Sequence, residues 1–379
     1  MFLKHRSSRS VLSGRLLVCL VSMNCLVGQG ADPEKAAQYR FESITIPAAS
    51  QDEPVIPFSL TKAARYVDQG AVAWSRGRKC VSCHTNGTYL QMRPALTSVL
   101  GKPQEVMREF FVQQLAEMRA KPLSELKSGL KPTQVAYVAA GLAEWDAHVT
   151  GEISVATRDA LDLMFQVQSK NGAWSNIRCW PPFESSDYQS ATVAAMAIAT
   201  APGYFKSLSS SHQAQLQRLL QYFKDTPPTH DYSRLLLLWV STRLPGVLTK
   251  AQQQETIAMI FKHQRADGGW SMRTFATPES WGDGSRAKKL RDEKQFNDPA
   301  SDGHQTGLAI VVLRDAGIAA QDARLQKGVH WLLSNQRQSG RWWTRSLNTD
   351  TYHFITYSGT VYPLLALHKC GALPVAKKQ

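Results

Sequence analysis

The chain has 379 residues and a formal net charge of +14 at neutral pH, with 44 Lys and Arg against 30 Asp and Glu. The basic residues are dispersed and form no stripe interleaved with aromatic side chains, which argues against nucleic acid as a partner. The excess charge suits contact with an acidic redox partner protein or an anionic membrane surface, and most of it serves solvation.

The chain begins with the features of an export signal. Four basic residues among the first 15 precede an apolar run over 16–27, which ends in small residues. This order is typical of a cleavable signal peptide, which we place at 1–30, and the run is short for a membrane span. The sequence therefore predicts a periplasmic or secreted protein, with an uncleaved membrane tether as the alternative. Residues 31–54 are predicted to form an irregular N-terminal extension.

The next feature is the pentapeptide from Cys80 to His84, which has the C-x-x-C-H spacing of a haem c attachment site. Two thiols a short turn apart can bond to the two vinyl groups of haem, and the adjacent imidazole can bind the iron. The sequence thus assigns Cys80 and Cys83 to attachment of one covalent haem c and His84 to metal binding, in a segment of 75–100. A dithiol redox pair or half of a zinc site is the competing interpretation, but no second C-x-x-C occurs.

The second axial ligand of such an iron cannot be assigned from spacing. Each candidate methionine has an alternative role in core packing, and each candidate histidine has an alternative structural role. Cys179 and Cys370 are predicted to be buried or loop thiols, with a disulfide between them as the alternative. The candidate ligands are Met92, Met107, Met118, His230, His304 and His353.

Beyond residue 55 the sequence has the apolar periodicity of helices, interrupted by Gly, Pro and Asn. Ala-rich and Leu-rich runs favour helix, and strand signals are sparse. The pattern predicts an all-α fold of about twelve helices in six hairpins. We place these helices near 58–73, 89–100, 104–119, 133–149, 154–168, 189–200, 210–224, 232–243, 250–264, 304–316, 321–334 and 358–369.

Three segments repeat one pattern just after predicted helices. Residues 168–174, 264–270 and 336–342 each read Gln-x-x-x-Gly-x-Trp. A glycine in the left-handed conformation can end a helix, while Gln and Trp can hold that end against the next hairpin. Residues 69–74 are predicted to be a degenerate fourth copy, with Ala73 in place of the glycine.

These repeats resemble the QW motifs of the terpenoid cyclase and protein prenyltransferase superfamily. The resemblance covers residues 55–372 and implies an α/α toroid, as in squalene cyclases, with 373–379 as a C-terminal tail. If the helices alternate between an outer and an inner ring, the loops within the hairpins all open at one mouth, where loops of a rigid scaffold usually carry function. Haem c would then be attached in the first hairpin loop, over that mouth.

The resemblance does not extend to the catalytic motifs of the superfamily. The chain has no D-x-D-D-T-A sequence, with which class II cyclases protonate an alkene. Asp187 lacks the neighbouring carboxylates of such a site and suits a helix N-terminal cap. The segment from Asp350 to His353 is similar to one that carries a zinc-ligand histidine in prenyltransferase β subunits, but the rest of that zinc set is missing. The expected fold therefore does not imply the reaction.

Three functions follow as hypotheses. The first is an exported monohaem c-type protein in electron transfer or haem-dependent oxidation, which uses a redox partner protein or a small apolar substrate. The alternative is an isoprenoid-binding or squalene cyclase-related enzyme in which the haem is auxiliary. The third is a docking module that uses the charged insertion 284–298, although such a run is also typical of a solvated loop. The alternative is favoured by aromatic residues expected near the mouth, which could equally be core residues: Trp180, Phe183, Trp281, Trp342, Trp343, Tyr352, Phe354 and Tyr357.

Overall fold

The computed structural model describes residues 37–174, 180–183 and 187–373. The predicted signal peptide, Cys179 and nearly all of the predicted tail lie outside these residues. The described part contains fifteen α-helices and one two-stranded sheet. Within it, no helix combines the length and the apolarity that a membrane crossing needs. The predicted helical class is confirmed for the body of the chain.

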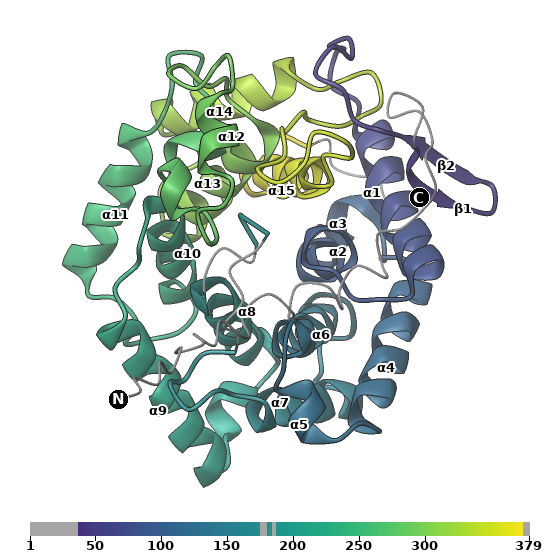
Figure 1. Cartoon of the computed structure of the whole chain (residues 1–379), viewed down its shortest axis with the longest axis vertical. Coiled ribbons are helices and arrows are strands. Elements are labelled where there is room, and N and C mark those ends of the chain that lie inside the picture. Colours follow the sequence, from purple (N-terminus) through teal and green to yellow (C-terminus); the bar gives the residue numbers. More distant parts are fainter. Residues whose placement is uncertain (1–36, 175–179, 184–186, 374–379) are drawn as a thin grey trace, which may run out of the picture.

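Six helical units form an inner ring, which Figure 1 shows nearly end-on. Each unit contacts the next along the chain, and the last contacts the first, so the ring is closed. In chain order the units are α2 (Thr88–Met92) with its continuation α3 (Thr97–Leu100), α6 (Lys131–Trp145), α8 (Asp187–Thr200), α10 (Asp231–Ser241), α13 (Gly303–Asp315) and α15 (Ile355–Lys369).

Six further helices surround this ring and lie along its circumference in Figure 1. They are α1 (Leu60–Arg78), α4 (Glu105–Arg119), α7 (Val155–Gln166), α9 (Ser210–Asp225), α11 (Lys250–Lys262) and α14 (Ala323–Ser334). The short helices α5 (Leu123–Leu126) and α12 (Ala287–Arg291) lie in connecting segments. The predicted alternation of outer and inner helices is therefore present. The predicted helix 89–100 is divided by a 3₁₀ turn at Pro94–Leu96, because proline lacks the N–H that a continuing helix needs.

The burial of the helices explains the two rings. In α8 every residue from Tyr188 to Ile198 is buried, as expected for a small, Ala-rich helix enclosed on all sides. In α9 only Leu216, Leu219, Tyr222 and Phe223 are buried, at the spacing of one helical face. A helix that is apolar all round goes inside, whereas a helix with one apolar stripe goes outside.

The three repeated motifs join outer helices end to end. The glutamine of each motif donates from Nε2 to the carbonyl of its own glycine, at 3.0, 2.8 and 2.9 Å. The same Nε2 also donates to a carbonyl at the N-terminal part of the next outer helix. These second acceptors are Gln215 in α9 at 3.0 Å, Arg324 in α14 at 2.7 Å and Ser59 before α1 at 3.1 Å. The third motif closes the outer ring, since it joins α14 to α1.

Glycine and tryptophan complete each motif. Gly340 has a φ of +89°, and a Cβ there would lie 2.5 Å from the backbone of Lys62 in α1. The tryptophan indole donates back to a carbonyl of its own helix at 2.7 Å in all three copies. The predicted fourth copy at 69–74 is wrong. Those residues lie inside α1, which continues to Arg78, and Trp74 instead points to the segment after that helix.

The N-terminal extension is more regular than predicted. Strands β1 (Ala37–Phe41) and β2 (Ile44–Pro47) form an antiparallel hairpin that packs on α1. The chain then runs along the third repeated motif, where Ile56 donates from its backbone N–H to Gln336 and Val55 bridges with Arg337. These strands are short and acquire their pairing by docking, so the sequence carried no strong strand signal for them.

Candidate functional site at the mouth of the toroid

The loops that precede the inner helices meet at one face of the toroid. Phe354 before α15 stacks on His84 before α2. Asn348 donates from Nδ2 to the carbonyl of Pro181 at 2.8 Å, so the last hairpin loop reaches the third one across the ring. Lys289 pairs with Asp350 at 3.1 Å, which joins the fifth and sixth loops. The predicted common mouth is present.

The C-x-x-C-H loop is held at this mouth through its carbonyl groups. Asn86 is fully buried and donates from Nδ2 to the Cys80 carbonyl at 3.0 Å, while its Oδ1 accepts from the Ser82 backbone N–H at 2.7 Å. Every carbonyl from 80 to 83 accepts a hydrogen bond. The donors are Trp74 and Asn86 to Cys80, Gln134 to Val81, Gly87 to Ser82 and Thr88 to Cys83. The loop therefore has one defined conformation before any cofactor is considered.

The His84 imidazole lies in an aromatic cluster. Its ring stacks on Phe354, with centroids 5.0 Å apart, and meets Trp74 edge-on at 4.6 Å. Tyr352 also stacks on Phe354, with centroids 5.2 Å apart. Burial lowers the pKa of His84 to about 3, so the imidazole is neutral at physiological pH. A neutral imidazole is the form that binds a metal.

One nitrogen of His84 is occupied and the other is not. Nδ1 lies 2.7 Å from the Thr85 hydroxyl. In the part of the chain that the structure describes, Nε2 makes no hydrogen bond. Iron-ligating histidines are usually held through the nitrogen that does not bind the metal, so this arrangement fits haem ligation by Nε2.

The two cysteines are placed consistently with the same group. Cys83 is buried and Cys80 is half-buried. The residues present fit a covalent haem c, with Cys80 and Cys83 for the thioether bonds and His84 for the iron.

None of the six candidate axial ligands makes a hydrogen bond or ring contact with His84 among the described residues. Met107 and Met118 are buried in α4, an outer helix, and Met92 is buried in α2. Both nitrogens of His304 are used, with Nε2 3.0 Å from the Tyr232 hydroxyl and Nδ1 2.8 Å from Ser358. Met92, Met107 and Met118 lie in the core, and His304 forms a buried polar link between Tyr232 and Ser358.

The other two histidines stabilise loops at the mouth. His230 caps α10 by accepting the Ser233 backbone N–H at Nδ1 (3.1 Å), and its buried Nε2 has no hydrogen-bond partner among the described residues. His353 accepts the Ser346 backbone N–H at Nδ1 (3.1 Å). Asp350, near it in sequence, pairs with Lys289 and with Arg345. No group of three or more metal-binding side chains occurs among the residues described.

The carboxylates nearest the mouth do not form a strong acid. Burial raises the pKa of Asp302 to about 6. Hydrogen bonds from backbone N–H groups, above all that of Gln305, act in the opposite direction. Both its oxygens already accept backbone N–H groups, from Gln305 at 2.8 Å and from Met272 at 2.7 Å. Asp187 lies in the first turn of α8. A carboxyl with a raised pKa is a weaker acid, which is the opposite of what alkene protonation needs.

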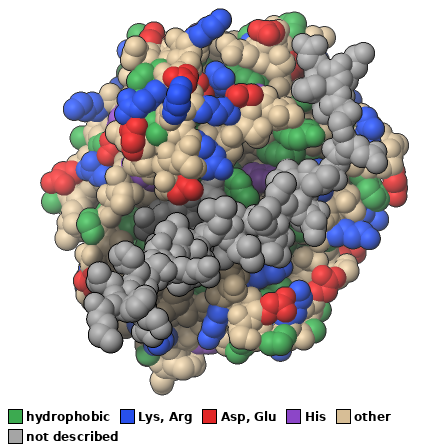
Figure 2. Space-filling model, viewed as in Figure 1, with side chains coloured by type: hydrophobic (Ala, Val, Ile, Leu, Met, Phe, Trp, Pro, Cys, Tyr) green, Lys and Arg blue, Asp and Glu red, His purple; other side chains and the backbone are tan. Residues whose placement is uncertain are grey.

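The charged insertion 284–298 is neutralised by its own neighbours. Within and beside α12, Lys288 pairs with Asp292 at 2.5 Å and Arg291 with Glu279 at 2.7 Å. Figure 2 shows basic and acidic side chains interspersed over the part of this face where Figure 1 places α12. The insertion is a network of ion pairs and does not present a basic patch.

Two cavities are described, and neither borders the C-x-x-C-H loop. One, of about 240 Å³, lies between β2 and α1 and is lined by Lys62 and Tyr66 among others. The other, of about 360 Å³, lies between the start of α8 and the segment 226–229 and is lined by Asp187 and Glu279 among others.

Comparison with known proteins agrees with the fold. A family model described as the squalene-hopene cyclase C-terminal domain matches residues 247–371, which contain the second and third repeated motifs. The chain is similar to a solved structure of a glycosidase with a glutamate-to-alanine substitution, with 11% identity over 77% of this chain and 87% of that chain and a TM-score of 0.50. Another solved structure, of a glycosidase variant in complex with glucose, has 13% identity over 83% and 86% and a TM-score of 0.44. No curated protein matches.

The family match and the first of these structures support a terpenoid cyclase-like α/α toroid. The family match covers about a third of the chain, and likeness to solved structures at such low identity concerns the fold alone. Sequence reasoning found the mouth loops and the C-x-x-C-H motif, but it missed Tyr39, Thr85 and Asn86. Tyr, Thr and Asn are common residues and occur here without a distinctive spacing. Thr85 and Asn86 directly follow the motif, and this position is the signal that could have marked them as its supports.

Proposed function

We propose that the protein is an exported toroid that binds an extended apolar molecule of the isoprenoid class at its mouth, beside one covalently attached haem c. The observation that carries this proposal is the cluster of half-buried aromatic rings around His84, on the mouth of a cyclase-like toroid. The family match of 247–371 supports the isoprenoid part, and the geometry of the C-x-x-C-H loop supports the haem part.

The aromatic cluster has the properties of an apolar binding surface. Trp74, Tyr352 and Phe354 each keep part of their surface exposed, as do Trp180 and Trp343. Burial of apolar surface is worth roughly 25 cal/mol per Å², so a ligand that covers several such rings would gain several kcal/mol. The loop contact between Asn348 and Pro181 crosses the mouth. The proposed ligand therefore lies on this face, against His84, rather than deep within the ring.

In this proposal the chain's residues hold and shield the haem. Cys80 and Cys83 form the covalent links, and Asn86 keeps the loop in the required conformation. Phe354 and Trp74 exclude water from the His84 ring. Haem, when bound, would supply redox chemistry. Cyclisation is not part of the proposal, because Asp302 has neither the acidity nor a spare oxygen for it.

The apolar ligand can be sought directly. Mature protein purified from an exporting host would be extracted with organic solvent, and the extract analysed by mass spectrometry for polyisoprenoid chains. We expect such a molecule at near-stoichiometric amounts, and at several-fold lower amounts in Trp343→Ser. A matched surface variant, Phe205→Ser, removes an exposed ring elsewhere and should leave the amount unchanged. Repeatedly ligand-free extracts would contradict the proposal.

A second candidate function is electron transfer by a monohaem cytochrome. It is favoured by the His84 imidazole, whose Nδ1 is held and whose Nε2 makes no hydrogen bond among the described residues. A pyridine haemochrome spectrum of the mature protein tests the haem itself, and we expect the band of a thioether-linked haem. Carbon monoxide then separates the candidates, because ready binding indicates an open iron beside the proposed ligand surface. No binding together with ligand-free extracts would leave electron transfer as the function.

A further inference from the structure

We infer that the exposed face of α1, together with the hollow between α1 and β2, binds an extended acidic segment of a partner protein. This face consists of Lys62, Arg65, Gln69, Arg76 and the C-cap Lys79, all of them exposed, and is called the α1 stripe below. The inference goes beyond the proposed function, because it requires neither the apolar ligand nor the haem.

Only the turn of the helix brings the residues of the α1 stripe together. Their spacings are three, four, seven and three residues, which return to one face of a helix after every two turns. From Lys62 to Arg76 the row is about 21 Å long, at 1.5 Å per residue. In Figure 1, α1 lies on the outer circumference of the toroid with the β1–β2 hairpin beside it. Basic residues that are dispersed in the sequence therefore form one continuous surface.

The four cations of the α1 stripe have no acidic partner in the part of the chain that the structure describes. Lys62 makes one hydrogen bond from Nζ, to the carbonyl of Gln338 at 3.1 Å. Asp68 is the acidic residue of α1, and it pairs with Arg93 at 3.2 Å. The cations of α12 differ, because each of them is paired with an acid. The α1 stripe, rather than the charged insertion, is thus available to an acidic partner.

Two of these cations lie where the helix itself does not favour them. Lys62 and Arg65 are in the first two turns of α1, and the first turn contains no acidic residue. The N-terminal end of a helix carries a partial positive charge, and like charges three residues apart repel each other. Arg76 and Lys79 lie at the opposite end, where the helix dipole explains them without a partner. Lys62 and Arg65 lack this explanation, and a bound acidic group would relieve their repulsion.

The hollow beside Lys62 and Arg65 offers a place for one acidic side chain of the partner. It has a volume of about 240 Å³, and its lining residues other than these two are uncharged. An ammonium group has three donors and a guanidinium has five, so donors remain for a carboxylate. Such charge-assisted hydrogen bonds are stronger than those between neutral groups.

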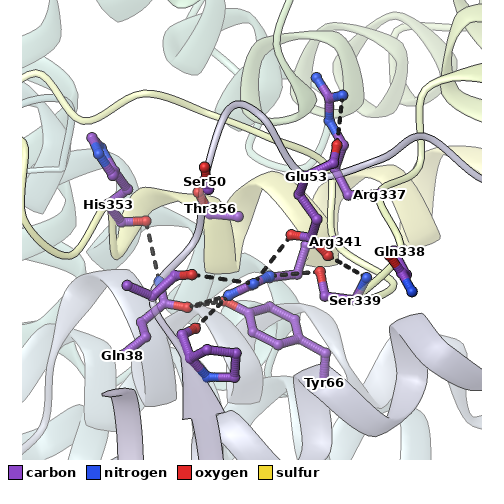
Figure 3. Close-up of polar contacts among 12 residues, drawn as sticks. Gln38, Ser50, Glu53, Tyr66, Arg337, Gln338, Ser339, Arg341, His353 and Thr356 are labelled. Carbon is purple, nitrogen blue, oxygen red and sulfur yellow. Dashed lines mark hydrogen bonds and ion pairs between the residues drawn. The ribbon is translucent and has the colours of Figure 1, made fainter. Parts of the chain in front are cut away.

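The chain-side wall of this hollow adds no repelling charge. Figure 3 shows Tyr66 and Ser339, which belong to the wall. The Tyr66 hydroxyl donates to Gln38 at 3.1 Å, and the Ser339 hydroxyl accepts from Nε of Arg341 at 2.7 Å. Glu53, which lies in the same view, pairs with Arg341 at 3.2 Å. An incoming carboxylate would therefore meet the two cations without an opposing free acid.

The shape and polarity of this surface favour a protein segment over a membrane. The hairpin stands beside α1 and borders the hollow, into which a flat bilayer cannot extend. Helices that lie on membranes insert large apolar side chains. Among the described residues, the exposed large hydrophobic side chains all lie outside the α1 stripe, at Val55, Leu123, Val155 and Phe205. An extended acidic segment can place one carboxylate in the hollow and others along the helix.

The C-terminal end of the α1 stripe adjoins the C-x-x-C-H loop. Lys79 directly precedes Cys80, and the guanidinium of Arg78 lies 5.8 Å from the centroid of the Trp74 ring. A partner bound along α1 would thus end next to the proposed haem. Its binding can be measured whether or not that group is attached.

The test is the binding of a fluorescein-labelled polyglutamate peptide to the mature protein, measured by fluorescence anisotropy. We expect the affinity to fall as salt is raised, since ions screen contacts between exposed charges. Lys62→Glu combined with Arg65→Glu should weaken binding about tenfold or more, because it reverses the charge at the proposed contact. Lys127→Glu combined with Lys170→Glu changes the net charge equally at exposed positions elsewhere. This control pair should weaken binding less than about twofold.

Folding of the variants is checked by their thermal unfolding midpoints. Acids near the N-terminus of a helix are favourable, so Lys62→Glu should not impair folding. If the double reversal does not fold, Lys62→Gln combined with Arg65→Gln tests the same contact. Carbodiimide cross-linking, which joins a glutamate carboxylate to a lysine amine, then locates the peptide. We expect mass spectrometry to find cross-links at Lys62 and Lys79 and not at Lys127.

Four results would overturn the inference. They are equal weakening by the two variant pairs, binding that does not respond to salt, cross-links away from the α1 stripe, and binding to phosphatidylglycerol vesicles but not to the peptide. The last result would assign the surface to a membrane. Ligand-free extracts or absence of haem would refute the proposed function and leave the peptide result standing.

Discussion

At the scale of single residues, the most consequential side chain near the candidate site is Asn86. It connects the Cys80 carbonyl, the Ser82 backbone and the Ser75 hydroxyl, at 3.0, 2.7 and 3.0 Å. The amide thus makes three hydrogen bonds that join the loop to α1, with Trp74 as a second donor to the Cys80 carbonyl. Leaving a buried polar group unsatisfied costs about 1–3 kcal/mol, which makes Asn86 a support of both the fold and the motif.

We predict that Asn86→Ala lowers the free energy of unfolding by about 2–4 kcal/mol, because several buried partners lose their hydrogen bonds together. Denaturant unfolding of the mature protein measures this. The yield of covalent haem should fall in parallel, since the two thiols no longer share one loop conformation.

Asn297→Ala is the matched control, because Asn297 is exposed in the insertion. Its unfolding free energy should stay within about 0.5 kcal/mol of the unmodified protein. Equal stability of the two variants would show that the loop is held by something other than Asn86.

At the scale of elements, the repeated motifs decide how outer helices meet. The glycine allows the backbone of one motif to touch the next helix, the glutamine bonds across that contact, and the tryptophan fills the space behind it. Gly340 lies at the junction between α14 and α1, where the two ends of the folded chain come together. Closure of the ring therefore depends on a turn that only glycine can make there.

We predict that Gly340→Ala is more destabilising than Gly317→Ala. The two glycines have nearly the same φ, +89° and +90°, so the backbone strain of an added Cβ is matched. Only at Gly340 would the Cβ meet the backbone of α1, whereas nothing lies within 4 Å at Gly317. The overpacking should add about 1–3 kcal/mol, measurable as the difference between the two unfolding free energies.

Equal losses in the two variants would mean that α1 moves away without cost. The junction would then be loosely packed, and the third motif would not be the closure of the ring. Thermal unfolding of both variants at one protein concentration is sufficient for this comparison.

At the scale of the whole molecule, the ends of the inner helices opposite the mouth are joined by charge. Glu144 near the end of α6 pairs with Arg243 at 2.6 Å and accepts from Thr200 at 3.1 Å. Arg243 also approaches Asp315 at the end of α13 (3.9 Å), which pairs with Lys369 at the end of α15 (2.5 Å). The network connects residues in or just after five inner helices. Ion pairs therefore link the inner ring at this end, and loop contacts link it at the mouth.

This network makes the stability of the toroid depend on pH. Burial alone would raise the pKa of Glu144, but Arg243 and His148 overcome it and hold the pKa below its ordinary value of 4.5. A carboxyl with a lowered folded-state pKa stabilises the fold above about pH 4.5, and this stabilisation is lost as pH falls through the folded-state pKa.

We predict that Glu144→Gln lowers the free energy of unfolding by about 3 kcal/mol at pH 7, because Arg243 loses its nearest partner in a buried place. The difference from the unmodified protein should shrink as pH falls from about 4.5 through the lowered folded-state pKa of Glu144, below which both proteins carry a neutral group at this position. Denaturant unfolding between pH 3 and pH 7 tests the prediction, with the exposed Glu117→Gln as control. A difference that is independent of pH would assign the loss to packing rather than charge.

The sequence by itself determined the helices, their order, the repeated motifs and the C-x-x-C-H segment. These features depend on residues close together in the chain, where helix periodicity, helix-ending glycines and ligand spacing leave a visible pattern. The sequence also indicated the toroid, because three copies of one motif are expected to make the same helix-to-helix connection three times. The fourth copy at 69–74 failed because the pattern was only partial and helix α1 runs through it.

Only the tertiary structure decided which groups surround His84. Phe354 lies at the far end of the chain and stacks on His84, while Tyr39, in a segment predicted to be irregular, packs on Phe354 and lies 2.9 Å from the Thr85 hydroxyl. Gln38, Tyr66 and Arg341 likewise meet from separate segments of the chain. Such contacts carry no local signature, since their residue types are common and their sequence separations are set by the whole ring. The sequence could therefore name the proposed iron ligand, but the closed toroid decided what holds it.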